Sequence, residues 1–284
     1  MDLGIKDRVA VVAASSRGLG QAAARGLARE GAKLALCARA SAPLDAAAEE
    51  IRRESGAEVM TRALDVTDYD EVRRFVAAVV ERFGRLDICV ANAGGPPAKS
   101  FAETTIEDWR AAADLNLMST VYFAKEALPV MQRQQWGRFI AITSVAVKQP
   151  VEGLILSNAL RSAVSGLIKT LANEYGRYGV LVNNVCPGYT ATARGGTQPQ
   201  AGREGRRRSG GDRGSLGAAD CPRPGGPARG IRRPGGIPRF RASHLHHRRG
   251  DCRRRRTGEG FVLIQAGPVP IWNAPLRSVG GREL

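Results

Sequence analysis

The chain has 284 residues, of which 43% are hydrophobic and 25% charged, and its formal net charge is +16. No apolar run approaches the ~18 residues that a transmembrane helix needs, and the N-terminus lacks the basic patch and apolar stretch of a secretion signal. The five cysteines include no Cys-x-x-Cys pair, so neither a disulfide scaffold nor a metal site is expected. These features predict a cytoplasmic protein with one large domain and no membrane partner.

The first two thirds of the chain alternate between strand and helix patterns. The apolar run at 8–14 predicts a strand, and the helical period at 21–31 ends in a glycine typical of a helix C-cap. Strands are predicted in the same way over 33–38, 58–64, 86–90, 137–142 and 180–185, and helices over 43–55, 70–83, 106–131 and 158–175. Apolar strands separated by helices indicate a parallel sheet covered on both faces. The fold class is therefore α/β, a doubly wound Rossmann sheet that binds ligands at the carboxyl ends of its strands.

A turn of small residues follows the first strand. Segment 14–20 reads Ala-Ser-Ser-Arg-Gly-Leu-Gly and leads into the first predicted helix. Such turns let backbone N–H groups and the helix N-terminus approach a pyrophosphate. Read alone, a glycine turn is weak evidence, and the alternative is a purely structural connection.

Small and polar residues also follow the later strands. Asn92-Ala93-Gly94 comes after the fourth strand, Ser144 after the fifth and Pro187-Gly188 after the sixth, while Asn116 lies in the helix between the fourth and fifth. The carboxyl ends of parallel strands meet at one edge of a sheet, so the set predicts a single ligand site there.

With these motifs, residues 4–194 resemble the classical short-chain dehydrogenase/reductase family, most closely its 3-oxoacyl-acyl-carrier-protein-reductase-like members. The family holds the cofactor phosphates in a Thr-Gly-x-x-x-Gly-x-Gly turn. Gly18 and Gly20 match this turn, whereas Ala13 and Ala14 occupy its first two positions. The methyl group of Ala14 therefore lies where backbone should approach the cofactor. The cofactor-binding residues expected on these grounds are Ser15, Ser16, Arg17, Gly18, Leu19, Gly20, Arg39, Asp65, Val66, Asn92, Ala93, Gly94, Pro187, Gly188 and Thr192.

The choice of cofactor depends on the end of the second strand. An acid there would bind the ribose 2′-hydroxyl of NAD(H), whereas arginine accommodates the 2′-phosphate of NADP(H). This strand ends in Arg39, and Arg17 adds a second positive charge in the turn, so NADP(H) is favoured. The resemblance also implies that Asp65 and Val66 lie beside the adenine and Thr192 beside the carboxamide. The alternative is that both arginines are solvated surface charges.

The expected catalytic centre departs from the family pattern. The resemblance implies hydride transfer with a tyrosine as acid/base, a lysine four residues later that lowers its pKa, a serine that polarises the carbonyl and an asparagine that holds a water. Ser144 and Asn116 fit the last two roles, but Ser157 and Arg161 occupy the tyrosine and lysine positions. An aliphatic hydroxyl is a much weaker acid than a phenol of pKa about 10, and arginine does not reproduce the point charge of lysine. Tyr189 is a possible substitute from the following loop.

The last third of the chain has a different composition. Residues 195–284 contain 19 arginines, no lysine and six acidic residues, a net charge of +13, together with 19 of the 34 glycines. No strand or amphipathic helix pattern is expected from residue 195 onward, which predicts a disordered basic tail lacking the family's last strand. The predicted boundaries are thus 1–194 for the Rossmann domain and 195–284 for the tail.

A shifted reading frame explains this tail. When the last two bases of each codon are grouped with the first base of the next, residues 245–249 permit Tyr-Ile-Thr-Gly, and residues 253–257 permit Val-Asp-Gly-Gly. Residues 238–240 likewise permit Leu-Ala-Ser. In order and spacing, these segments resemble the last helix and strand of the same family. The sequence therefore favours a frameshift close to residues 194–196.

Three functional hypotheses remain at this stage. The first is an NADP(H)-dependent reductase of a ketone or 3-oxoacyl thioester, with a homo-oligomer formed through the helix at 158–175 as in the family. The second is a catalytically inactive dinucleotide-binding or scaffold protein, which Ser157 and Arg161 favour. The third is non-specific binding of a polyanion such as nucleic acid through the arginine-rich tail.

Overall fold

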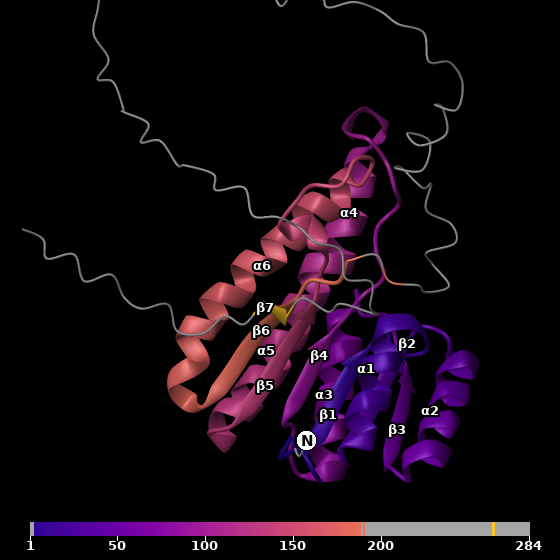
Figure 1. The fold of residues 1–284 in the computed structure, drawn as a ribbon, viewed down its shortest axis with the longest axis vertical. Coiled ribbons are helices and arrows are strands. Elements are labelled where there is room, and N and C mark those ends of the chain that lie inside the picture. The colour runs from indigo at the N-terminus through magenta and orange to yellow at the C-terminus, as the bar shows by residue number, and fades with distance from the viewer. Residues whose placement is uncertain (1–2, 189, 191–262, 265–284) are drawn as a thin grey trace, which may run out of the picture. The chain divides into compact units, whose positions relative to one another are not determined.

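The computed structural model describes residues 3–188, 190 and 263–264. Seven strands form one sheet in the order β3-β2-β1-β4-β5-β6-β7 (Figure 1). The strands are β1 Val9–Ala13, β2 Lys33–Ala38, β3 Val59–Ala63, β4 Ile88–Ala91, β5 Gly137–Ile142, β6 Val180–Val185 and β7 Leu263–Ile264. Neighbours from β3 to β6 pair in parallel, which confirms the predicted doubly wound sheet.

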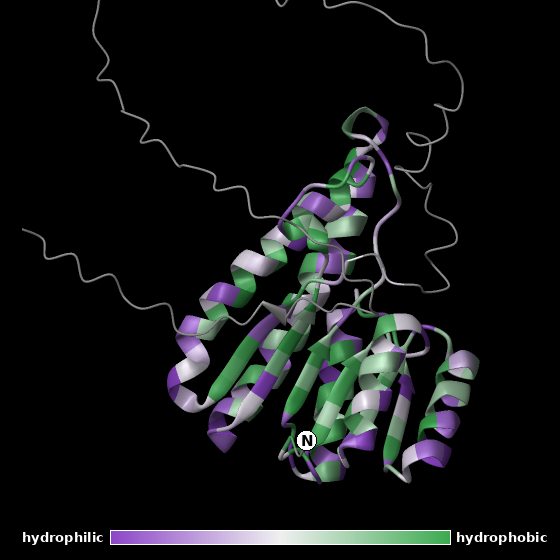
Figure 2. Cartoon of the chain, viewed as in Figure 1, coloured by the Kyte–Doolittle hydropathy of each residue, from purple (hydrophilic) through white to green (hydrophobic). Residues whose placement is uncertain are grey.

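Helices cover both faces of this sheet. The helices are α1 Gly18–Arg29, α2 Ser41–Ser55, α3 Tyr69–Phe83, α4 Ile106–Ala113, α5 Ser119–Gln134 and α6 Ile155–Tyr175. Val9 and Val11 of β1 belong to the core cluster under α3, α5 and α6, whereas Ala10 and Val12 belong to the cluster under α1 and α2. Strand residues therefore alternate between two apolar layers, and the strands carry mostly hydrophobic colours in Figure 2. Within the described residues, no helix is long and apolar enough to cross a membrane.

Several element boundaries differ from the sequence-based expectation. The predicted helix at 106–131 is α4, a π-helical turn η2 at Asp114–Met118, and α5, which continues to Gln134. Helix α1 begins at Gly18 rather than residue 21, and α6 begins at Ile155 rather than residue 158. Glycine has a low helix propensity, so propensity alone places the start of α1 too late. Three short 3₁₀ turns complete the description: η1 Phe101–Glu103, η3 Val145–Val147 and η4 Gly176–Tyr178.

The prediction that no strand occurs beyond residue 194 is wrong at β7. Leu263 lies opposite Val185 and Ile264 opposite Asn184, in an antiparallel pair with β6. The edge of a sheet offers backbone donors and acceptors to any extended segment. The apolar sequence Phe-Val-Leu-Ile at 261–264 is of the type that favours strands, although it stands in an otherwise Arg-rich and Gly-rich tail. The rest of the predicted tail lies outside the described residues.

A buried carboxylate joins the two strands whose ends carry the candidate site. Asp87, which precedes β4, accepts hydrogen bonds from the Val9 backbone N–H (2.9 Å) and from the guanidinium groups of Arg8 (2.9 Å) and Arg85 (2.7 Å). Burial opposes ionisation of Asp87, but these hydrogen bonds outweigh burial and lower its pKa below the ordinary 3.8. The cluster fixes β1 against β4 at their amino ends.

Candidate active site

The turn after β1 is tightly packed and partly strained. Ala14 has a φ of +48°, in the left-handed region that L-residues seldom adopt, and Gly18 follows with a φ of +63°. The buried Ser15 donates from its backbone N–H (3.1 Å) and from its Oγ (3.3 Å) to the carbonyl of Cys37 at the end of β2. A Cβ at Gly20 would lie 2.3 Å from the Ala14 carbonyl oxygen, so only glycine fits there. The turn at 14–20 is therefore a closely packed backbone cradle, and its predicted binding of cofactor phosphates stays a prediction.

Asn92 connects this turn to the end of β4. Its Nδ2 donates to the carbonyls of Ala13 (3.3 Å) and Ala14 (3.4 Å). The same Nδ2 would lie 2.9 Å from a Cβ at Gly20. The predicted phosphate turn and the predicted Asn-Ala-Gly segment are therefore parts of one hydrogen-bonded unit.

Two arginines stand exposed at this edge. Arg17 occupies the N-cap position of α1 without a side-chain capping hydrogen bond, and Arg39 directly follows β2. Within the described residues, no carboxylate lies within ion-pair distance of either guanidinium. Ser16 and Leu19 are half-buried beside them. Both charges are thus available to an anionic ligand.

The two residues expected beside the adenine differ in their surroundings. Asp65 is engaged in a local turn: its Oδ1 accepts from the backbone N–H (3.0 Å) and the hydroxyl (2.9 Å) of Thr67. The backbone N–H of Asp65 donates to Glu71 (2.7 Å). Val66 is buried in the core under α3. Their side chains therefore hold the loop after β3 in place.

The carbonyl of Gly94 accepts hydrogen bonds from two predicted catalytic residues. Asn116 Nδ2 donates to it at 2.8 Å and Arg161 Nη2 at 3.2 Å. Asn116 lies in the π-helical turn η2 and is only 2% exposed, and its buried Oδ1 has no hydrogen-bond partner among the described residues. A π-turn often marks a functional position in a helix, and here it places the asparagine at the site.

The guanidinium of Arg161 joins the ends of two strands. Besides Gly94, it donates through Nη1 to the carbonyl of Ile142, the last residue of β5 (2.6 Å), and through Nη2 to the carbonyl of Ala93 (3.4 Å). Arg161 is 8% exposed. Its hydrogen bonds to these carbonyls hold the loop after β4 against the end of β5.

Ser144 lies where β5 ends. Its Oγ accepts from the Ala146 backbone N–H (3.1 Å), so its hydroxyl hydrogen is directed elsewhere and can donate to a ligand. The neighbouring Val145 N–H donates to the carbonyl of Pro187 (2.8 Å), which joins the loops after β5 and β6. Gly188 is exposed beside this connection.

Ser157 is half-buried on α6, one helical turn before Arg161 and therefore on the same side of the helix. Its side chain makes no hydrogen bond within the described part of the chain. Tyr189 and Thr192 lie outside the described residues. Sequence reasoning did not foresee that Arg161 binds the carbonyls of Ala93, Gly94 and Ile142, since backbone acceptors carry no residue signature.

The thiol groups of the described cysteines take no part in this site. Cys37, Cys89 and Cys186 are buried free thiols. Burial raises the pKa of Cys37 to about 12 and also raises that of Cys89. The thiols of Cys37 and Cys89 therefore stay protonated near neutral pH and are poor nucleophiles.

Comparison with known proteins decides the family. The family model described as short chain dehydrogenase matches residues 8–201. The chain belongs to the short-chain dehydrogenase family. This confirms the resemblance drawn from the sequence motifs. A curated member of this family, the 3-oxoacyl-[acyl-carrier-protein] reductase of Synechocystis sp., is 37% identical over 186 residues, which cover 65% of this chain and 75% of the relative.

Solved structures of other oxidoreductases are similar to this chain in fold. L-sorbose reductase from Gluconobacter frateurii, in complex with NADPH and L-sorbose, is similar with a TM-score of 0.66 and 34% identity over 68% of this chain and 73% of its own. An alcohol dehydrogenase from the archaeon Thermococcus sibiricus, in complex with 5-hydroxy-NADP, has a TM-score of 0.64 and 33% identity over 70% of this chain and 83% of its own.

Proposed function

We propose that this chain is an NADP(H)-dependent oxidoreductase that acts on a ketone or 3-oxoacyl substrate. The turn at 14–20 suits the phosphates of a dinucleotide. Only glycine fits at position 20, and the backbone N–H groups at the N-terminus of α1 follow directly after residues 14–17. The relatives support the assignment, since one is named as a 3-oxoacyl reductase and the two solved structures hold NADPH and 5-hydroxy-NADP. When bound, the nicotinamide group would supply or accept the hydride.

The preference for NADP(H) rests on the exposed arginines at this edge. Arg39 replaces the acid that would bind a free ribose 2′-hydroxyl, and Arg17 lies in the phosphate turn. Both can donate charge-assisted hydrogen bonds to a 2′-phosphate. We expect Arg39→Ala to weaken NADPH binding roughly tenfold or more and to leave NADH binding nearly unchanged. Equal losses for both cofactors would contradict this assignment; Arg74→Ala, an exposed arginine on α3, is the matched control.

Within the site, Ser144 would donate its hydroxyl hydrogen to the substrate carbonyl oxygen and so polarise the carbon. Asn116 would hold the Gly94 carbonyl in place, with its buried Oδ1 able to accept a hydrogen bond from water. The weak step is proton donation. The alkyl hydroxyl of Ser157 is a poor acid, and Arg161 already donates to backbone carbonyls.

A second candidate function follows from that weakness: a dinucleotide-binding protein without catalytic activity. NADPH oxidation with a short 3-oxoacyl thioester, measured beside NADPH binding, separates the two. An oxidation rate that Ser144→Ala abolishes would support the reductase. Tight NADPH binding with no oxidation above background would support the inactive binder and contradict the primary proposal. In that case, the double variant Ser157→Tyr with Arg161→Lys should raise the NADPH oxidation rate roughly 100-fold or more above that background.

We also propose that codons beyond about 195 are read in a shifted frame. The family match ends at residue 201, close to the change in composition. Resequencing the codons for residues 189–202 tests this. One inserted or deleted base that restores a Leu-Ala-Ser, Tyr-Ile-Thr-Gly and Val-Asp-Gly-Gly ending would support the proposal, and an unchanged reading frame would refute it.

A further inference from the structure

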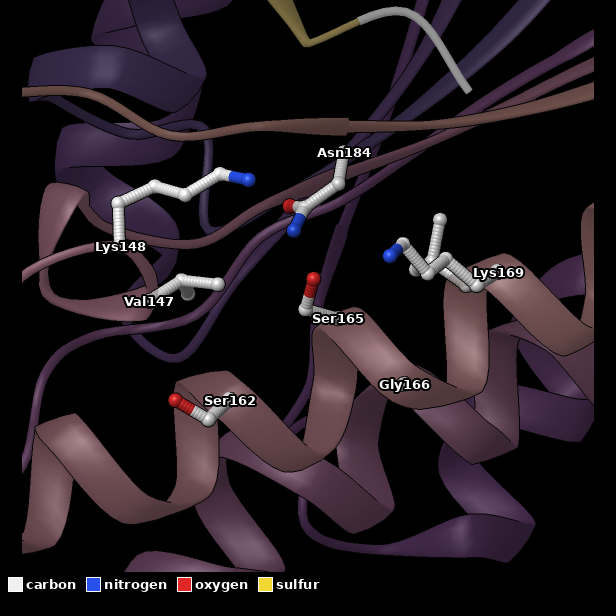
Figure 3. A pocket seen from close by; sticks show the side chains of 8 residues that line it. Val147, Lys148, Ser162, Ser165, Gly166, Lys169 and Asn184 are labelled. Atoms are coloured by element: carbon white, nitrogen blue, oxygen red, sulfur yellow. The ribbon is translucent and has the colours of Figure 1, made fainter. Parts of the chain in front are cut away.

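A cavity of about 290 Å³ lies between helix α6 and strand β6 (Figure 3). Its wall is formed by α6, by the end of β6 and by the turn η3 that follows Ser144. The lining residues are Val147, Lys148, Ser162, Ser165, Gly166, Ile168, Lys169 and Asn184. Among the described residues, none that is proposed to bind the cofactor or to act in catalysis lines this cavity.

Each polar side chain of the cavity can donate hydrogen bonds, and none of the described lining residues is acidic. Figure 3 shows the ammonium groups of Lys148 and Lys169 reaching toward Asn184 from two sides, with the Ser165 hydroxyl below it. Two positive charges and several donors without a carboxylate form an environment that favours an anion.

Asn184 gives the cavity an oriented donor. Its side chain is 7% exposed, and its Oδ1 accepts a hydrogen bond of 2.7 Å from Thr143 Oγ1. The amide nitrogen is then left facing the cavity, and it has no hydrogen-bond partner in the described part of the chain (Figure 3). Because its oxygen is held by Thr143, the amide keeps a fixed orientation, and its nitrogen can donate to a ligand in the cavity.

The lysines are also available. Lys148 lies at the end of η3 and Lys169 on α6, both exposed. Neither makes an ion pair or a side-chain hydrogen bond with any described residue, unlike Lys33 and Lys99, which pair with Glu58 and Asp108.

We propose that this cavity binds the phosphate group of a small organic phosphate. The ammonium groups of Lys148 and Lys169, the Asn184 amide and the Ser165 hydroxyl would donate to the phosphate oxygens, while Val147 and Ile168 supply an apolar wall for the organic part. The cavity volume of about 290 Å³ is many times the volume of about 30 Å³ that one water occupies in the liquid, so it leaves room for an organic group beside the phosphate. The site is separate from the proposed cofactor site, so each can fail without the other.

The test is titration of the full chain with phenyl phosphate, inorganic phosphate and neutral benzyl alcohol, followed by calorimetry. Lys148→Gln combined with Lys169→Gln removes the two charges at the cavity. Lys6→Gln combined with Lys125→Gln removes two exposed lysines elsewhere and changes the net charge equally. NADPH binding is measured on both double variants.

We expect saturable binding of phenyl phosphate that the cavity variant weakens roughly tenfold or more and the control variant changes less than twofold. Inorganic phosphate should bind more weakly, and benzyl alcohol should not bind. Absence of saturable phenyl phosphate binding, or an equal loss in both variants, would overturn the proposal. So would a matching loss of NADPH affinity in the cavity variant, because phenyl phosphate would then be reporting the cofactor site.

Discussion

Replacing Ala14 with glycine should stabilise the protein. Ala14 holds a φ of +48°, which costs an L-residue about 1–2 kcal/mol. Glycine removes that strain, but it also gives the unfolded chain more conformational freedom, which lowers the stability of the folded chain by about 0.4–1 kcal/mol. Because the methyl group is only half-buried, its loss costs little. The net expectation is a gain of about 0.5–1 kcal/mol in the free energy of unfolding, or roughly 1–4 °C in Tm.

Thermal and urea unfolding of the two proteins measure this gain. Ala13→Gly is the control with the opposite sign: Ala13 is fully buried in β1, so glycine there removes core contact and adds backbone freedom, which costs about 1 kcal/mol or more. Because the turn should approach a dinucleotide, Ala14→Gly should also bind NADPH more tightly. A Tm equal to or below that of the unaltered chain would refute the argument from strain.

Three further predictions concern packing and ionisation. Gly20→Ala should abolish NADPH binding and lower Tm, because the added Cβ would lie 2.3 Å from the Ala14 carbonyl oxygen; wild-type affinity in a titration would contradict this. The thiols of Cys37 and Cys89 should resist a disulfide reagent at pH 8 until the chain is unfolded, since burial raises both pKa values, to about 12 for Cys37. Asp87→Asn should cost about 2–3 kcal/mol near neutral pH. The pKa of Asp87 is lower in the folded chain than its ordinary value of 3.8. Its contribution to the free energy of unfolding is therefore complete above pH 3.8 and is lost as the pH falls through the folded pKa. The free energies of unfolding of wild type and variant, measured in urea, should converge in acid.

The sequence predicts the sheet because buried parallel strands are short, apolar and separated by amphipathic helices. Within the described residues, all six parallel strands appear near their predicted positions, and Asn92 is hydrogen-bonded to the start of the turn at 14–20. These features depend on local pattern and on residue types with few alternatives, such as glycine at position 20.

Other features depend on tertiary contacts that no local pattern encodes. The partners of Arg161 are backbone carbonyls, and the π-turn around Asn116 arises where a helix accommodates an extra residue against its neighbours. Strand β7 pairs across many intervening residues of tail composition. The cavity beside Asn184 likewise requires the relative placement of a helix, a strand and a loop.

The parallel order of the sheet also bears on how the chain is made. All five parallel pairings join residues between Val9 and Val185. A ribosome has therefore synthesised every parallel strand before it reaches the arginine-rich codons, and domains generally fold as their N-terminal portions emerge. The nascent sheet can assemble regardless of the frame in which the remaining message is translated, so an altered ending would change the finished edge of the sheet and not its beginning.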